Sequence, residues 1–374
     1  MAQIILNASH GYAGLDRWMK DSGTGRIFLV CGNSLRLLPL DSYFKSLQER
    51  LGITVTRFSS FHPNPSYESV KKGVQKFRES RADSMIAAGG GSAMDVAKCI
   101  RIFSGRNKAG SCLEQEPVAG HIRLLAIPTT AGSGAEATKF AAVYDQGEKK
   151  SVAHEACRPD AVYLDAGLLQ TLPDYVKKSA FMDAFCHAVE SFWSVNSTDE
   201  SRKYSLEAVK LILENGDRYF AGMFDAGENM LLAAHLAGKA IDIAQTTAGH
   251  AMCYQMTRIY GIAHGHAAAL CVKQLWPWMI ANTDKCADIR GRRYLDAVFG
   301  ELASAMGCTA ALAAADRFCK IFDDLKLPLP DAGKTGIWPA AASVNAERLK
   351  NNPVALSSGD ISGIYQKIFQ DTET

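Results

Sequence analysis

Four side chains in the second half of the chain could bind a metal ion together: Asp183, His187, His250 and His264. Asp183 and His187 are four residues apart, so in a helix they lie one turn apart on the same face. His250 and His264 follow much later and can join the first pair only through the fold. One carboxylate and three imidazoles are a suitable ligand set for a divalent first-row metal, most naturally Fe(II) or Zn(II). The alternative is an ordinary surface or capping pair followed by two unrelated histidines.

A glycine-rich segment in the first half could bind a phosphate group. The segment Gly89–Ser92 lies between a short apolar run, Ser84–Ala88, which predicts a strand, and a helical pattern, Ala93–Phe103. Backbone N–H groups of such a junction can approach an anion, and the helix N-terminus adds partial positive charge. The segment is not the G-x-G-x-x-G dinucleotide fingerprint, and a flexible strand–helix turn is the alternative.

A second loop with small and hydroxyl side chains follows the next predicted strand. The strand Ile122–Ile127 leads into Pro128–Glu136, which contains Thr129, Thr130 and Ser133. Such residues after the carboxyl end of a strand suit a ligand site at the edge of an open sheet. A polar loop or helix cap is the alternative.

The elements that must position these residues change in character along the chain. About the first 165 residues alternate β-branched runs with amphipathic patterns, which predicts an α/β sheet with crossover helices. Helical patterns dominate after the change near Leu169–Pro173. The expected strands are Arg26–Cys31, Ile53–Phe58, Ser84–Ala88, Ile122–Ile127 and Ala161–Asp165, and the expected later helices are Tyr175–Trp193, Asp199–Leu213, Glu228–Ile243, Tyr294–Met306 and Ala310–Leu325.

The composition is that of an ordinary globular protein. The chain has 374 residues, of which 47% are hydrophobic and 21% charged, and its formal net charge is +2. This near-neutral charge gives no indication of a surface that binds nucleic acid. No run of about 18 or more apolar residues predicts a membrane span, and the N-terminus lacks the features of a secretory signal. Ten scattered cysteines without a Cys-x-x-Cys pair favour reduced thiols, so we expect a cytoplasmic protein.

Taken together, these motifs resemble the iron-containing (group III) alcohol dehydrogenase family. The matching segments follow the family's order and spacing over most of the chain. They are PNP at Pro63–Pro65, GGGSAMDVAK at Gly89–Lys98, IPTTAGSGAE at Ile127–Glu136, the helix with Asp183 and His187, and the pair His250 and His264. The resemblance implies an NAD(P)-dependent alcohol dehydrogenase or aldehyde reductase.

The resemblance also implies the architecture and the roles of single residues. It implies an α/β dinucleotide-binding domain over residues 1–168, an all-helical metal-binding and catalytic domain over residues 169–374, and a site in the cleft between them. The four ligand candidates would hold the metal. The cofactor contacts would be Gly90, Gly91 and Ser92 at the pyrophosphate with Asn64 close by, then Thr129, Thr130, Ser133 and Lys150, with Asp95 facing the cleft unless it only caps the following helix.

Two positions depart from the family's pattern. Some NAD-preferring relatives carry an aspartate at the end of the strand matching Arg26–Cys31, where this chain has Gly32. A carboxylate there would repel a 2′-phosphate, so its absence favours NADPH, although glycine also permits NADH. Many relatives carry a histidine four residues after the third ligand, where this chain has Tyr254. Tyr254 or His266 could conduct protons instead; a packed tyrosine and a surface histidine are the alternative.

The expected chemistry is the reduction of an aldehyde to a primary alcohol. A divalent cation would act as a Lewis acid on the carbonyl oxygen, and the nicotinamide would supply the hydride. Three stretches resemble the phosphonoacetaldehyde reductase subgroup: Lys139–Glu155, Glu190–Ser201 and Gly261–Leu270. The substrate would then be phosphonoacetaldehyde and the product 2-hydroxyethylphosphonate. Cationic candidates for the phosphonate are Lys139, His154, Arg258 and His266.

Three alternatives stay open at this point. A neutral short-chain aldehyde such as lactaldehyde or butyraldehyde would need an apolar pocket, for which the chain offers Phe140, Tyr144, Phe192 and Trp193. A lyase of the dehydroquinate synthase type would consume no nicotinamide. A non-catalytic protein would be expected to lack ligands or glycines that are present here. The family also suggests a homodimer or a larger homo-oligomer.

Overall fold

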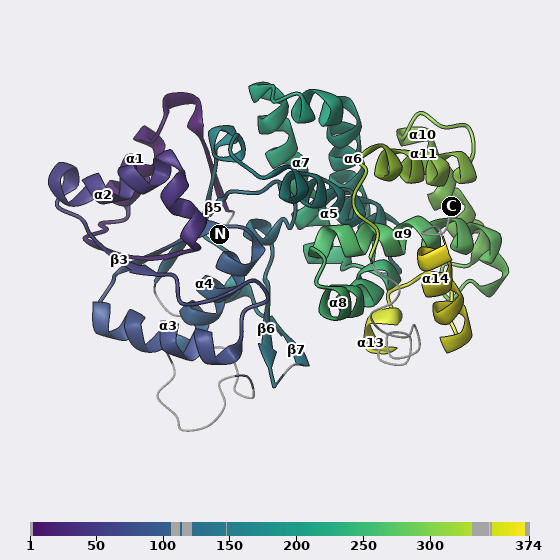
Figure 1. Cartoon of the computed structure of the whole chain (residues 1–374), viewed down its shortest axis with the longest axis horizontal. Coiled ribbons are helices and arrows are strands. Elements are labelled where there is room, and N and C mark those ends of the chain that lie inside the picture. The colour runs from purple at the N-terminus through teal and green to yellow at the C-terminus, as the bar shows by residue number, and fades with distance from the viewer. Residues whose placement is uncertain are drawn as a thin grey trace. The chain divides into compact units, whose positions relative to one another are not determined.

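The computed structural model describes residues 3–105, 113, 122–146, 148–330, 344 and 346–370 (Figure 1). The chain divides into an N-terminal unit, Met1–Leu172 with Gly222–His235, and a helical unit, Pro173–Ala221 with Leu236–Thr374. The sequence predicts a boundary after residue 168, whereas the N-terminal unit runs to Leu172 and includes a later segment. That segment packs closely because Gly227 has no side chain: a Cβ there would lie 3.2 Å from the Ala166 Cβ.

The N-terminal unit is built on a six-stranded parallel sheet with the order β1-β8-β5-β4-β2-β3. A separate antiparallel hairpin joins β6 and β7. The strands of the sheet are β1 (Ile4–Asn7), β2 (Arg26–Cys31), β3 (Thr54–Phe58), β4 (Ser84–Gly89), β5 (Arg123–Pro128) and β8 (Ala161–Leu164), and those of the hairpin are β6 (Phe140–Asp145) and β7 (Glu148–Ala153).

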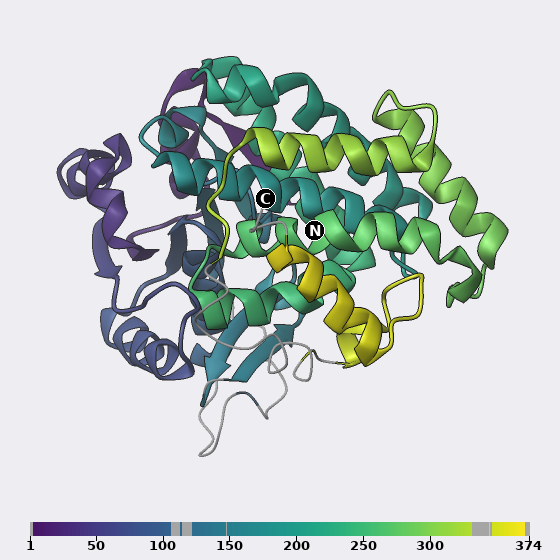
Figure 2. The same cartoon turned by 45° about the vertical axis from the view of Figure 1, so that its right-hand side comes forward.

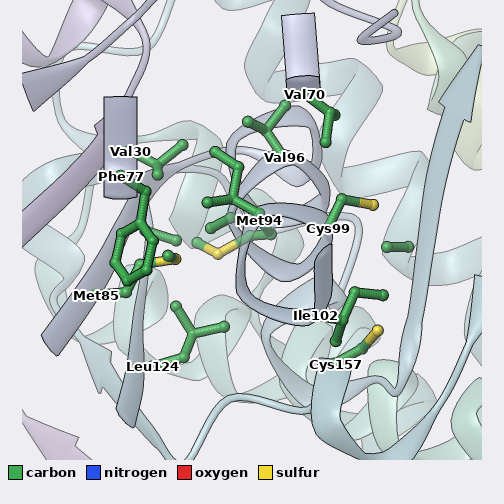
Figure 3. Close-up of a cluster of buried hydrophobic side chains, with 14 of the residues drawn as sticks. Val30, Val70, Phe77, Met85, Met94, Val96, Cys99, Ile102, Leu124 and Cys157 are labelled. Carbon is green, nitrogen blue, oxygen red and sulfur yellow. The ribbon is translucent and has the colours of Figure 1, made fainter. Parts of the chain in front are cut away.

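Helices cover both faces of this sheet (Figure 1). The central strands are buried almost throughout, which is why they read as continuous apolar runs. One face packs against α1 (Ala13–Asp21) and α2 (Pro39–Leu51). The other face packs against α3 (Tyr67–Ser80) and α4 (Gly91–Ser104). Figure 3 shows Phe77 of α3 and Met94 and Ile102 of α4 in the same buried cluster as Val30 and Leu124 of the strands.

The helical unit is organised around α5, whose residues are buried on nearly every side. Helix α5 contacts α6 and α9, and α9 also contacts α8, α11 and α14. Figure 2 shows these helices, coloured from teal to yellow, from a second direction. The later helices are α5 (Asp174–Trp193), α6 (Asp199–Phe220), α7 (Phe224–Ala244), α8 (Ala248–Tyr260), α9 (His264–Ala281), α10 (Arg292–Ala305), α11 (Ala311–Asp324), α13 (Ala346–Leu349) and α14 (Ser358–Gln370). Of these, α7 belongs to the N-terminal unit up to His235 and to the helical unit from Leu236.

The predicted fold class is confirmed: a parallel α/β half is followed by a helical half. Every expected strand and helix exists, within a few residues of its predicted ends except for α6, which runs to Phe220 instead of Leu213. The nine described cysteines form no disulfide, and no helix among the described residues is long and apolar enough to cross a membrane.

Candidate metal centre and nucleotide-binding residues

Three of the four predicted metal ligands form one buried cluster in the helical unit. Asp183 and His187 lie on α5, and His250 lies on α8. Asp183 Oδ1 is 3.9 Å from His187 Nε2 and 3.5 Å from His250 Nε2, and one donor atom of each residue lies within 4.8 Å of the others. The two imidazole rings stack with centroids 4.5 Å apart. One cation with ligand bonds of about 2.0–2.2 Å can bridge donors at such separations.

His264 lies beside this cluster as the first residue of α9. Its ring centroid is 5.3 Å from that of His250, and the interplanar angle of the two rings is 62°. Tyr254 stacks on His264, also at 5.3 Å, with an interplanar angle of 22°. The structure therefore brings all four predicted residues together, with His264 at the edge of the compact set of three.

Two buried atoms of the cluster, Asp183 Oδ1 and His250 Nε2, lack a hydrogen-bond partner among the described residues. Buried polar atoms are costly when nothing compensates them, so such a pair points to an additional group. A carboxylate oxygen with imidazole nitrogens is a donor set that Fe(II) and Zn(II) accept. The residues present therefore fit a divalent cation.

The charges of the cluster reinforce one another. Burial would raise the pKa of Asp183, but the neighbouring imidazoles, His187 foremost, lower it below its usual range. Burial would lower the pKa of His250, yet the carboxylates of Glu190 and Asp183 raise it above the ordinary histidine value. The carboxylates of Asp183 and Glu190 thus stay ionised in the cluster, and a bound cation would replace the proton that they favour on His250.

Glu190 is a member of this site that our sequence analysis did not identify. It lies on α5 with no exposed surface and accepts hydrogen bonds from residues at the start of α8. Oε1 accepts from Thr247 N at 3.1 Å, Thr247 Oγ1 at 2.7 Å and His250 N at 3.3 Å, and Oε2 pairs with His250 Nδ1. The signal was present in the sequence, because Glu190 follows Asp183 by two helical turns on the same face.

Two glycines allow the ligand-bearing helices to approach α5 closely. A Cβ at Gly249 on α8 would lie 2.5 Å from Val272 Cγ2 and 3.0 Å from Glu190 Oε1. A Cβ at Gly265 on α9 would lie 2.1 Å from Ser179 O and 2.5 Å from Asp183 Cβ. A side chain at either position would push its helix away from α5. The two glycines therefore allow His250 and His264 to come this near to α5.

In the N-terminal unit, the glycine segment predicted to bind phosphate and the loop predicted as a ligand site lie side by side. Strands β4 and β5 pair in parallel, so the glycine segment and the loop with Thr130 and Ser133 leave the same edge of the sheet. A Cβ at Gly90 would lie 3.3 Å from Thr130 Oγ1, and one at Gly91 would lie 3.2 Å from Ser133 Oγ. Thr129 N donates to Gly89 O at 3.0 Å. The start of α4 thus has bare backbone and neighbouring hydroxyl groups, as an anion requires.

The strand order places these residues at the point where ligands bind in open α/β sheets. From β2 the chain passes to β3 on one side and then returns to β4 on the other. The position between β2 and β4 is therefore a topological switch point, and ligands bind outside the carboxyl ends of the strands there. Gly32 follows β2, and Gly90 and Gly91 follow β4.

Three other predicted cofactor residues lie outside these two loops. Asn64 lies in the turn before α3 with a φ of 57°, and Lys150 lies on β7 paired with Glu148 at 2.7 Å; the described contacts do not connect either residue with the glycine segment. Asp95 is the fifth residue of α4 and so cannot cap its start. Burial raises the pKa of Asp95 to about 6, although Lys98 and Lys149 oppose this.

His266 is not a surface residue, which corrects one of the two alternatives for it. It is fully buried on α9. Tyr175 Oη accepts from Ala263 N at 2.9 Å and lies 3.1 Å from His266 Nδ1, to which it can donate. Burial lowers the pKa of His266 to about 4, so its imidazole is neutral at pH 7. The contacts tie the start of α9 to the start of α5, and a role in proton transfer stays a prediction.

Comparison with known proteins identifies relatives of the chain. The family model for "Iron-containing alcohol dehydrogenase" matches residues 3–166, and that for "Fe-containing alcohol dehydrogenase family, C-terminal" matches residues 178–369. A phosphonoacetaldehyde reductase of Streptomyces viridochromogenes is 35% identical over 268 residues, 68% of each chain. An NADPH-dependent butanol dehydrogenase of Clostridium saccharobutylicum is 27% identical and covers 70% of this chain and 69% of its own.

Solved structures agree on the fold. Sulfoacetaldehyde reductase from Bifidobacterium kashiwanohense, solved in complex with NAD+, superposes with a TM-score of 0.85 at 24% identity, over 98% of this chain and 96% of that one. The family models cover both halves of the sequence, and the relatives are alcohol dehydrogenases and aldehyde reductases. The chain therefore belongs to the iron-containing alcohol dehydrogenase family and is an NAD(P)-dependent oxidoreductase that interconverts aldehydes and alcohols.

Proposed function

We propose that this oxidoreductase reduces phosphonoacetaldehyde to 2-hydroxyethylphosphonate, using NAD(P)H and one divalent metal ion, Fe(II) or Zn(II), held by Asp183, His187, His250 and His264. The observation that carries the metal assignment is the buried cluster of carboxylate and imidazole donors, in which Asp183 Oδ1 and His250 Nε2 have no hydrogen-bond partner among the described residues. The relative with 35% identity supports the substrate assignment.

The residues of the cluster prepare the site for charge that develops during reduction. A cation bound there would supply Lewis acidity toward a carbonyl oxygen, and nicotinamide would supply the hydride. Asp183 would offset part of the charge of such a cation, and the imidazoles would complete a ligand set without redox chemistry of their own. The buried environment around α5 excludes water, which strengthens every electrostatic interaction in the site.

A cation next to the cluster supports an anionic substrate. In the helical unit, the guanidinium carbon of Arg348 on α13 lies 4.5 Å over the ring of Tyr254. The same ring stacks on His264, so Arg348 and a proposed ligand imidazole contact one aromatic ring. Guanidinium groups suit phosphonate oxygens because they offer paired N–H donors. Of the four cationic residues considered from the sequence, His154 instead caps a short helical turn through its Nδ1, and His266 is buried and neutral.

For the cofactor we propose a preference for NADPH. No carboxylate stands at Gly32–Ser34, directly after β2, where it would repel a 2′-phosphate. The residues proposed to contact the cofactor are Gly32, Asn64, Gly90, Gly91, Ser92, Asp95, Thr129, Thr130, Ser133 and Lys150.

An initial-rate screen tests the proposal. Purified protein is assayed with phosphonoacetaldehyde, lactaldehyde and butyraldehyde, with NADH and NADPH, before and after metal stripping and refilling. We expect the highest kcat/KM with phosphonoacetaldehyde and NADPH, loss of activity on stripping, and recovery with Fe(II) or Zn(II). A higher kcat/KM for lactaldehyde or butyraldehyde would select the neutral-aldehyde alternative. Turnover without net nicotinamide oxidation would select the lyase.

A further inference from the structure

The carboxylate of Glu190 is the most completely buried acidic group near the ligand cluster, and its two oxygens have different partners. Oε1 accepts hydrogen bonds from Thr247 N, Thr247 Oγ1 and His250 N at the start of α8. Oε2 pairs with Nδ1 of the His250 ring. One oxygen therefore serves the backbone of α8, and the other serves the imidazole of a proposed metal ligand.

The contact of Oε1 alone has a structural explanation. Helix α8 has no side-chain hydrogen bond from its own N-cap residue, Thr247. The first N–H groups of a helix need acceptors, and Glu190 supplies one from α5. A local Asp or Asn could do this at lower cost, because a fully buried carboxylate loses its hydration. Capping therefore accounts for Oε1 and leaves the contact of Oε2 with the ring unexplained.

The contact of Oε2 fixes the state of the His250 ring. A carboxylate without a proton can only accept, so Nδ1 of His250 must carry the hydrogen. In the neutral ring Nε2 is then the nitrogen with the free lone pair. This is the nitrogen that lies 3.5 Å from Asp183 Oδ1 and lacks a hydrogen-bond partner. The same contact also opposes rotation of the ring about χ2, because rotation would move Nδ1 away from Glu190 Oε2.

We propose that Glu190 is a positioning residue that holds His250 in the Nδ1–H tautomer and aims Nε2 at the cation. This inference rests on the proposed function, since it concerns the same ligand cluster. Glu190 acts through His250 and does not bind the cation itself. Carboxylates that accept from metal-bound imidazoles typically contribute about 10–100-fold to metal affinity.

The variant Glu190→Gln separates the two contacts. Its amide oxygen can still accept from Thr247 and His250 N, but its NH₂ group cannot accept from His250 Nδ1. The ring is then driven toward the other tautomer, which places a hydrogen on Nε2. Thr247→Val is the matched control: it removes one donor to Oε1 and leaves the contact between Oε2 and Nδ1 in place.

The measurement is the dissociation constant for Zn(II) and Co(II), determined by competition with a chelator, together with the thermal midpoint of the metal-free protein. We expect Glu190→Gln to bind both ions about 10–100-fold more weakly and to change the visible spectrum of the Co(II) form. Thr247→Val should lower the midpoint and keep the affinity. If Glu190→Gln binds both ions within twofold of the wild type, or if both variants lose affinity in proportion to their midpoints, Glu190 is only a helix cap.

A second measurement needs no variant, which matters because Glu190→Gln could fail to fold. In Zn(II)-loaded wild-type protein labelled with ¹⁵N-histidine, NMR should show His250 protonated at Nδ1. A ring without a hydrogen on Nδ1 would overturn the inference while leaving the metal assignment intact. Wild-type protein that binds neither Zn(II) nor Co(II) would overturn the metal assignment and the role of Glu190 together.

Discussion

Replacing Gly265 by alanine should move a ligand-bearing helix away from its neighbour. The new Cβ would lie 2.1 Å from Ser179 O, 2.5 Å from Asp183 Cβ and 3.0 Å from Asp183 Cα, whereas ordinary contacts begin at 3.4 Å. Two of these three atoms belong to the backbone of α5 and cannot swing aside. The start of α9, which carries His264, must therefore retreat by about 1 Å, because close-packed interiors do not absorb such overlaps.

Two magnitudes follow from this displacement. Overpacking of this kind costs about 1–3 kcal/mol in the free energy of unfolding. A metal site tolerates errors of about 0.2 Å in its ligand distances, and misplacing a catalytic group by about 1 Å can cost about 100-fold in rate. We therefore expect kcat/KM to fall by about 100-fold, a loss larger than the change in stability can explain.

Gly261→Ala is the control. This glycine ends α8 with a φ of +68°, and no atom lies within 4 Å of its Cβ position. A left-handed alanine costs about 1–2 kcal/mol, so this variant is destabilised to a similar degree without a clash against α5. The assay compares unfolding of the metal-free proteins, metal affinity and kcat/KM. If Gly265→Ala retains the affinity and kcat/KM of Gly261→Ala, close approach of α9 to α5 is not required by the site.

The remaining predictions concern single contacts. His250→Ala should abolish metal content and turnover together, as measured by elemental analysis and initial rates; full activity would remove the metal assignment. Gly32→Asp should weaken NADPH binding by at least about tenfold more than NADH binding, because two like charges meet where β2 ends; equal effects on both would show that Gly32 does not face the 2′ position. Arg348→Gln should raise KM for phosphonoacetaldehyde by about tenfold and leave that for butyraldehyde unchanged; a parallel change would exclude Arg348 from phosphonate recognition.

The sequence predicted the sheet well because its central strands are buried on both faces. Strand β2 was predicted with its observed bounds, Arg26–Cys31, since five of its six residues are buried. Strand β1 was not predicted, because Ile4–Asn7 is short and mostly exposed at the edge of the sheet. The pairing of β1 with β8 is a tertiary property that a run of four residues does not encode.

The candidate site, like the sheet, was predicted only in part. The spacing of Asp183 and His187 predicted their common helix face, and the resemblance to a family suggested His250 and His264 as partners. Helices α8 and α9 were not among the expected elements, so the sequence could not show how their N-termini meet α5. Glu190 was missed because its partners, Thr247 and His250, lie far along the chain, and long-range pairing leaves no local pattern.

The proposed ligand residues come from three helices that are separate in the chain, and a cation bound there would couple its own supply to the lifetime of the protein. An unfolded chain scatters these residues, so the free energy of binding a cation adds directly to the stability of the folded state. At a free concentration of one hundred times Kd the gain is about 2.7 kcal/mol. Scarcity of the ion would then reduce the amount of enzyme through unfolding and proteolysis as well as the fraction that is active.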